Sequence, residues 1–139
     1  MILVDTNVIS EPLRKTPEPR VVAWINVQPL ETLYLSAVTV AELRFGVASL
    51  PPGKRRDGLH ESLETRVLPL FAGRILSFDL AASQAYAELM GNARAAGALP
   101  STTDGLIAAT AMANGMMVAT RDIAPFEAAG VTVIDPWNA

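Results

Sequence analysis

The sequence contains no cysteine among its 139 residues. Disulfide bonds, thiol catalysis and zinc-thiolate sites are therefore excluded, and the composition suits a reducing compartment. Histidine is almost absent too, because His60 is the only one. A Ser-His-Asp triad would have to use it, yet no nucleophile or orienting acid lies near it in sequence. We expect His60 to occupy a surface position on a polar helix.

The chain also lacks a basic leader segment and any long apolar run. A secretory signal begins with a basic segment, and a transmembrane helix requires about 20 apolar residues. We therefore expect a cytoplasmic protein with no membrane association. Positive charge is scarce as well, since the net charge is −3. Binding of nucleic acid through a broad basic face is disfavoured, so a nucleic-acid role would need a metal ion or local basic patches.

What is present indicates one globular α/β domain over residues 1–139, because compact domains commonly have about 100 to 150 residues. Half of the residues are apolar and 18% are charged. Short apolar segments alternate with helix-patterned ones, which is typical of parallel strands buried on both faces. We predict a three-layer α/β/α sandwich around a central, mostly parallel sheet. The expected strands are 2–4, 32–35, 74–77, 116–119 and 131–134, and the expected helices are 21–27, 39–50, 60–67, 80 to about 97, and 105–113.

Four acids fall where this fold would bring them to one edge of the sheet. Asp5 directly follows the first strand, and Asp122 follows the fourth strand after two residues. Glu42 and Asp104 each precede an apolar helical run. In open parallel sheets the ligand site lies beyond the carboxyl ends of the strands. The four acids are therefore predicted to share one rim.

Each acid also has a purely structural interpretation, which stays open here. The segments 39–42 and 101–104 both fit the capping-box pattern, in which the last residue's carboxylate satisfies a free N–H group at the start of a helix. Asp5 and Asp122 would likewise serve as N-caps of short helices after their strands. We interpret Asp135, which follows the last strand, as a turn acid.

The combination of four acids favours a metal site. Two carboxylates about 5 Å apart repel each other by roughly 3 kcal/mol at an effective dielectric near 20. Arg121 could supply one positive charge, but an all-oxygen set of ligands suits Mg²⁺ or Mn²⁺ better than zinc or copper. Such an ion would activate a water and offset charge that develops on a phosphate.

Four motifs, in order, carry a resemblance to a known family: MILVDTNVIS, SAVTVAELRFG, TTDGLIAATAMANGMMVATRD and VIDPW. Over essentially the whole chain the sequence resembles the PIN-domain ribonucleases, specifically the VapC-type toxins of bacterial toxin-antitoxin pairs and, among these, the FitB type. The resemblance implies an α/β/α sandwich whose acids bind one or two divalent ions at the carboxyl end of the sheet.

The resemblance also assigns roles to residues. Asp5, Glu42 and Asp104 match the three core acids, and Asp122 matches a fourth position at which the family is looser. Pro125 stands where many relatives carry another acid, which implies that a second ion would bind weakly. Polar residues next to these acids are expected to support the site: Thr6, Asn7, Thr120 and Arg121.

The implied activity is hydrolysis of RNA phosphodiester bonds with Mg²⁺ or Mn²⁺, and the implied partner is a small ribbon-helix-helix antitoxin whose tail lies across the acidic groove. The resemblance further implies a homodimer that contacts DNA only through the antitoxin. An alternative stays open, in which the scaffold mainly binds its antitoxin and regulates DNA occupancy with little nuclease turnover. The sequence does not decide between these functions.

Some basic and aromatic residues have weaker assignments. The run 54–56 is a candidate phosphate contact, although a solvated loop between helices is the favoured interpretation. Arg44 is interpreted as a partner contact, because residues two apart on a helix face different directions and it cannot share a site with Glu42. Trp24 and Trp137 are interpreted as packing residues.

Overall fold

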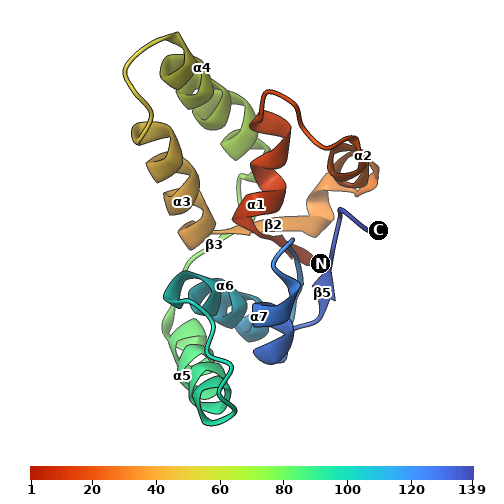
Figure 1. The fold of residues 1–139 in the computed structure, drawn as a ribbon, viewed down its shortest axis with the longest axis vertical. Helices are drawn as coiled ribbons and strands as arrows, with labels where there is room; N and C mark the ends of the chain where they lie inside the picture. The colour runs from red at the N-terminus through yellow and green to blue at the C-terminus, as the bar shows by residue number, and fades with distance from the viewer.

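The computed structural model describes residues 1–139, in which five parallel strands form one sheet with the order β3-β2-β1-β4-β5 (Figure 1). The first strand therefore lies at the centre, between β2 and β4. This arrangement confirms the predicted α/β class and parallel pairing. The strands are β1 Ile2–Val4, β2 Leu33–Ser36, β3 Ile75–Leu76, β4 Met117–Ala119 and β5 Val133–Ile134.

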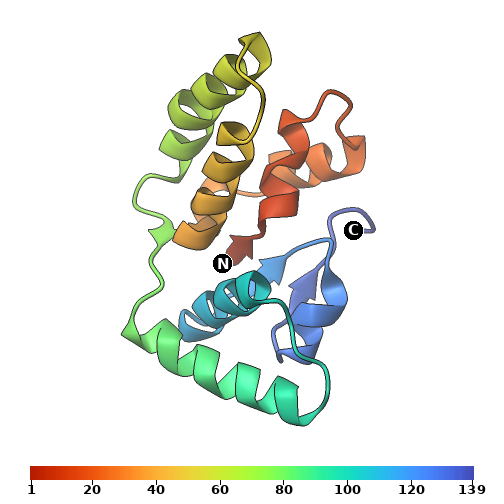
Figure 2. The same cartoon turned by 60° about the vertical axis from the view of Figure 1, so that its left-hand side comes forward.

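Helices cover both faces of the sheet, which confirms the three layers (Figures 1 and 2). One face is covered by α1 to α4 and the other by α5 to α7. Short 3-10 and π-helical turns belong to this layer: residues 11–13 join α1 to α2, residues 30–32 lead from α2 into β2, and residues 63–71 lead from α4 towards β3. The helices are α1 Thr6–Ile9, α2 Pro19–Val27, α3 Ala37–Ala48, α4 Lys54–Ser62, α5 Leu80–Ala95, α6 Thr102–Ala113 and α7 Ile123–Ala128.

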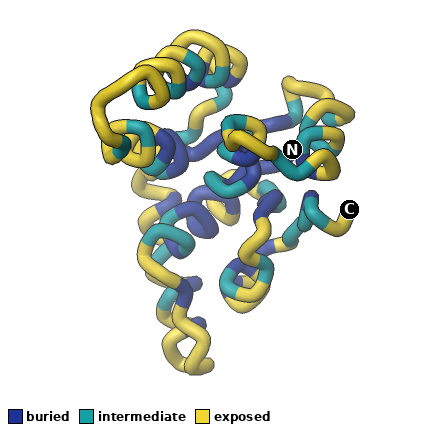
Figure 3. The backbone as a smooth tube through the Cα atoms, turned by 45° about the horizontal axis from the view of Figure 1, so that its top comes forward, coloured by how far each residue is buried: buried dark blue, intermediate teal, exposed yellow.

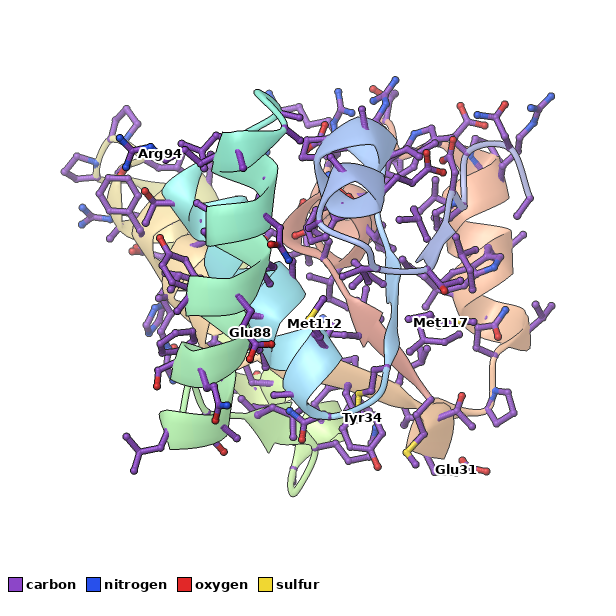
Figure 4. All side chains as sticks on the ribbon, turned by 90° about the horizontal axis from the view of Figure 1, so that it is seen from below. Glu31, Tyr34, Glu88, Arg94, Met112 and Met117 are labelled. Carbon is purple, nitrogen blue, oxygen red and sulfur yellow. The ribbon has the colours of Figure 1, made fainter.

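The central strand divides the core in two, because successive side chains of a strand point to opposite faces. Ile2 and Val4 pack among the helices of the first layer, whereas Leu3 packs against α5, α6 and α7. Buried residues run through the sheet while the outer turns of the helices are exposed (Figure 3). In the second layer α5 lies outside α6 and carries the exposed Glu88 and Arg94 (Figure 4).

The strand β2 ends one residue later than predicted, and this changes the start of the next helix. Ser36 is the N-cap of α3, since its Oγ accepts a hydrogen bond from the N–H of Thr39 at 2.9 Å. The capping box predicted over 39–42 is therefore wrong, because Glu42 lies beyond the first turn of α3.

The helix predicted over 60–67 is also placed wrongly, because α4 already begins at Lys54 and residues 63–67 form a π-helical turn. The basic run 54–56 is thus the first turn of a helix and no loop. Exposure explains the error: α4 contains no buried residue, so it shows no apolar periodicity. His60 lies exposed on this polar helix, as predicted.

Other differences are smaller. The apolar spacing of Leu80, Tyr86, Leu89 and Ala93 predicts one packed face of α5, but Leu80 is 88% exposed. The last strand was expected over 131–134 but covers only Val133–Ile134, so Val131 lies before it. Trp24 and Trp137 pack against the core of the first layer, which confirms their interpretation as packing residues. No helix of the chain combines the length and the apolar character needed to cross a membrane.

Candidate metal centre

Asp5 lies where β1 ends and α1 begins, and it is 3% exposed. Its Oδ1 accepts a hydrogen bond from the Thr6 N–H at 2.8 Å, and its Oδ2 accepts one from the Thr120 hydroxyl at 2.7 Å. Burial, with a smaller contribution from the negative charges of Asp104 and Glu42, raises the pKa of Asp5 to about 6, against the effect of the two hydrogen bonds. The central strand thus ends in a buried carboxylate without a counter-ion.

Asp104 lies in the first turn of α6. The N-cap of that helix is Ser101, whose Oγ accepts a hydrogen bond from the Asp104 N–H at 3.1 Å. Ser101 therefore supplies the serine half of the capping box over 101–104, and it fixes the turn that carries Asp104. Partial burial and the nearby charge of Asp122 both raise the pKa of the Asp104 carboxyl.

Asp122 follows β4 and occupies the N-cap position of α7, yet its side chain caps no N–H group of that helix. Its Oδ2 instead accepts a hydrogen bond from Nδ2 of Asn7 at 3.2 Å. The structural interpretation as an N-cap is therefore wrong for this side chain. Asp122 is exposed and its carboxylate is directed to the other acids.

Three of the four predicted acids converge closely. One carboxylate oxygen from each of Asp5, Asp104 and Asp122 lies within 4.8 Å of the other two. None of the three forms a salt bridge, since the ion pairs of the chain are Arg14 with Glu11 and Arg44 with Glu64. Oxygen donors of this kind fit a hard divalent ion.

Glu42 adjoins this group without belonging to it. Its Oε1 accepts a short hydrogen bond of 2.5 Å from the hydroxyl of Thr6, whose N–H is bound to Asp5. One residue therefore connects the two acids from β1 and α3. The distance is typical of a hydroxyl that donates to a carboxylate.

The predicted supporting residues separate into two groups. Asn7 and Thr120 join the acids: Asn7 Nδ2 lies 3.4 Å from the Thr120 hydroxyl as well as contacting Asp122, and the Thr120 oxygen accepts the Asp122 N–H at 3.0 Å. Arg121 contributes only its backbone, whose N–H donates to Asn7 Oδ1 at 3.2 Å. Its guanidinium lies over the ring of Trp137, 4.9 Å from the centroid.

Two residues near the acids were missed by the sequence analysis. Ser36 and Thr39 are both buried, their hydroxyl oxygens lie 3.1 Å apart, and the Thr39 oxygen lies 3.3 Å from that of Thr6. A serine directly between a strand and a helical run is an N-cap signal that indicates Ser36. No sequence signal indicates the contact of Thr39 with Thr6, because it depends on how α1 packs on α3.

Asp135 and Arg44 have local partners. The carboxylate of Asp135 accepts hydrogen bonds from the N–H of Trp137 at 2.9 Å and from the Asn138 side chain at 2.7 Å, which confirms the turn interpretation. Arg44 pairs with Glu64 in its own chain. Its role as a partner contact stays a prediction.

Residues 2–131 match the family model described as PIN domain. Three similar proteins cover almost all of both chains. Plasmid stability protein StbB of Pseudomonas syringae pv. tomato is 60% identical and covers 100% of each chain. VapC ribonuclease Y4jK of Sinorhizobium fredii is 58% identical, and Toxin FitB of Neisseria gonorrhoeae is 55% identical, each with 99% of both chains covered.

The fold also matches solved structures. The crystal structure of FitAcB from Neisseria gonorrhoeae contains a chain that is 55% identical, with a TM-score of 0.97 and 100% of both chains covered. The structure of FitAB bound to an IR36 DNA fragment gives a TM-score of 0.96, covering 99% of this chain and 96% of that one. At these TM-scores the fold is the same over almost the whole length of the chains.

Proposed function

Because the chain belongs to the PIN-domain family, we propose that it is a metal-dependent ribonuclease toxin that a small antitoxin inhibits. The observation that carries this proposal is the group of Asp5, Asp104 and Asp122, with carboxylate oxygens within 4.8 Å of one another and no salt bridge. Uncompensated carboxylates at this distance repel each other unless a cation lies between them. A 58% identical relative is named a VapC ribonuclease, which supports RNA as the substrate class.

The three clustered acids would hold Mg²⁺ or Mn²⁺ directly or through water, with Glu42 at the edge of the set. A bound ion of this kind supplies an activated water for attack on phosphorus and offsets the charge that develops on the phosphoryl oxygens.

The chain's own residues orient the acids in advance. Two hydrogen bonds fix both oxygens of the Asp5 carboxylate, and the Asn7 amide holds the exposed Asp122 at the mouth of the site. Hydrogen bonds from rigid elements to ligand side chains keep a site in its productive geometry. Asp122 would complete the set of ligands or orient the attacking water, since it is the most accessible of the three acids.

A groove beside the acids supports the inhibition by an antitoxin. Its volume is about 340 Å³, it begins at Thr6 and Glu42, and it extends between α1, α3 and α4. We propose that the antitoxin tail lies here, as the family resemblance implies. Its apolar lining residues are Leu13, Leu43, Val47, Leu50, Leu59 and Leu63.

The proposed assembly is a homodimer that pairs with antitoxin and contacts DNA through it. FitAB, whose FitB chain is 55% identical to this one, has been solved bound to a DNA fragment. The net charge of −3 makes this chain itself a poor DNA ligand. RNA as the substrate implies action in the cytoplasm.

The test is cleavage of a mixed tRNA and mRNA pool by the purified, partner-free protein, with Mg²⁺ or Mn²⁺ and with EDTA. We expect cleavage that requires the ion and is lost in Asp104→Asn. Glu88→Gln, which removes an exposed acid on α5, serves as the matched control and should cleave normally. A folded protein that cleaves no RNA with either ion would contradict the proposal.

The second candidate is a binding module that regulates DNA occupancy with little turnover. The solved complex of FitAB with DNA favours it, because that complex is an assembly for binding DNA. A protein that binds Mn²⁺ and an antitoxin but leaves every RNA in the pool intact would fit this alternative.

A further inference from the structure

Three hydroxyl groups form a continuous row that ends at Glu42. The Ser36 oxygen lies 3.1 Å from that of Thr39, the Thr39 oxygen lies 3.3 Å from that of Thr6, and the Thr6 hydroxyl donates to Glu42 Oε1 at 2.5 Å. Ser36 is 1% exposed and Thr39 is fully buried. The row therefore runs from the interior, at the junction of β2 and α3, outward to the acids.

The direction of the donors follows from counting hydrogens, because each hydroxyl has one hydrogen to donate. Thr6 uses its hydrogen for the carboxylate of Glu42, so its oxygen accepts from Thr39. Thr39 has then used its own hydrogen, so its oxygen accepts from Ser36. Every donor points toward the negative charge, and hydrogen bonds arranged head to tail strengthen one another.

The cap of α3 alone does not explain the Thr39 hydroxyl. Capping uses the Ser36 oxygen and the Thr39 N–H, and it would persist without that hydroxyl. Thr39 is the third residue of α3, so the helix offers its hydroxyl no carbonyl four residues earlier, unlike that of Thr110, which donates to Leu106 at 2.8 Å. The Thr39 hydroxyl is therefore left to contact another element, α1, through Thr6.

We propose that Ser36 and Thr39 are positioning residues of the metal centre, which act on Glu42 through the hydroxyl of Thr6. This inference rests on the proposed function, since it assigns Glu42 to the ion's surroundings. Thr6 also donates its N–H to Asp5 at 2.8 Å, so the row fixes the acid of α3 relative to the acid that follows β1. Outer hydrogen-bond partners of this kind typically change metal affinity or activity by about 10 to 100-fold when they are removed.

The deciding experiment is a calorimetric titration of the purified, partner-free protein with Mn²⁺. Thr39→Val removes the hydroxyl and keeps the branched shape and the Ser36 cap, whereas Thr39→Ser keeps the hydroxyl. Thr110→Val is the matched control, because Thr110 is equally buried and its hydroxyl serves only its own helix. Thermal unfolding of each variant reports separately on any purely structural role.

We expect Thr39→Val to bind Mn²⁺ about 10-fold or more weakly, and Thr39→Ser and Thr110→Val to bind as the unmodified chain does. The Mn²⁺ concentration for half-maximal RNA cleavage should rise by the same factor, with the rate recovered at saturating Mn²⁺. Should Thr39→Val fail to fold, Thr6→Val removes the last hydroxyl of the row at a half-buried position and should weaken binding at least as much.

Equal Mn²⁺ affinity of Thr39→Val and the unmodified chain would overturn the inference, as would a Thr39→Ser variant as weak as Thr39→Val. An unmodified chain that binds Mn²⁺ but cleaves no RNA would contradict the proposed function while leaving the comparison of affinities valid. Failure of the unmodified chain to bind Mn²⁺ would overturn both.

Discussion

Two acidic side chains of this molecule, in different regions, have opposite electrostatic surroundings. On the surface between α3 and the π-helical turn 63–67, Glu64 accepts hydrogen bonds from the guanidinium of Arg44 at 2.8 and 3.1 Å, and this partner lowers the pKa of Glu64. At the carboxyl end of the sheet, Asp5 has no cationic partner, and burial raises its pKa to about 6. The chain therefore pairs a charge at the surface and leaves the buried one unpaired.

This difference favours a binding site in the Asp5 region rather than at the Arg44–Glu64 pair. A buried, unpaired carboxylate costs stability, whereas an exposed ion pair contributes little either way. A cost of this kind at a cluster of acids is typical of functional sites. Variants at the acid rim and at the Arg44–Glu64 pair test this contrast.

Asp5→Asn should abolish cleavage, because the amide keeps the size of the side chain but cannot supply a charged ligand. We expect the cleavage rate to fall by more than about 100-fold, which is the upper range for removing a hydrogen-bond partner of a metal ligand. The measurement is the initial rate of RNA cleavage in saturating Mn²⁺. The control is Glu64→Gln, which makes the same acid-to-amide change at the Arg44–Glu64 pair. Equal losses of cleavage in both variants would contradict a special role for Asp5.

The stability of the ion-free protein should depend on pH through Asp5. The pKa is near 3.9 in an unfolded chain and about 6 in the folded one, so the folded state holds the proton more tightly. This contribution, up to about 3 kcal/mol, is fully present below about pH 4 and is lost as the pH rises through about 6.

Urea unfolding in EDTA at several pH values measures this dependence. Asp5→Asn should remove the contribution of Asp5 to the fall in the free energy of unfolding between about pH 4 and pH 6, so the variant gains relative to the unmodified chain as the pH rises. Parallel pH profiles for the two proteins would show that the Asp5 carboxyl is not protonated preferentially in the folded state.

Thr120→Val should weaken Mn²⁺ binding at the acid rim without abolishing it. Thr120 is fully buried and donates to Asp5 at 2.7 Å, so its loss leaves one carboxylate oxygen of Asp5 without a partner. We expect Mn²⁺ affinity to fall by about 10-fold, the lower range for an outer partner. Thr120→Ser, which retains the hydroxyl, should bind normally, and a serine variant as weak as valine would indicate a packing role instead.

Glu64→Gln should have the smallest effect. Arg44 is more than half exposed and Glu64 about a quarter exposed, so water and salt screen their attraction. We expect unchanged cleavage and a small shift in the midpoint of thermal unfolding that disappears in about 1 M salt. A loss of cleavage would show that the Arg44–Glu64 pair is needed for activity.

Much of the fold and three of the acid positions could be predicted from the sequence. Continuous apolar strands separated by helices dictate parallel pairing, and Asp5 and Asp122 follow from the ends of two strands that are neighbours in the sheet. The sequence pattern predicts a strand most clearly where the strand is buried on both faces. It predicts helices least clearly for α4, which is exposed and so has no apolar pattern, and for α1, whose four residues are too few to show a helical period.

The relation of Glu42 to the other acids could not be predicted in detail. Its helix starts at Ala37 because Ser36 caps it, so Glu42 lies beyond the first turn and contacts Thr6 rather than the cluster. That contact joins residues 36 positions apart and depends on the packing of α1 against α3. Periodicity and capping signals are local, so they do not report such distances.

The central claim is that the unpaired acids of the rim bind a divalent ion. Titration of the partner-free protein with Mn²⁺, followed by calorimetry for the unmodified chain and for Asp104→Asn, tests it most directly. We expect saturable binding by the unmodified chain that is lost or greatly weakened in Asp104→Asn. Equal binding by the two proteins, or none by either, would contradict it.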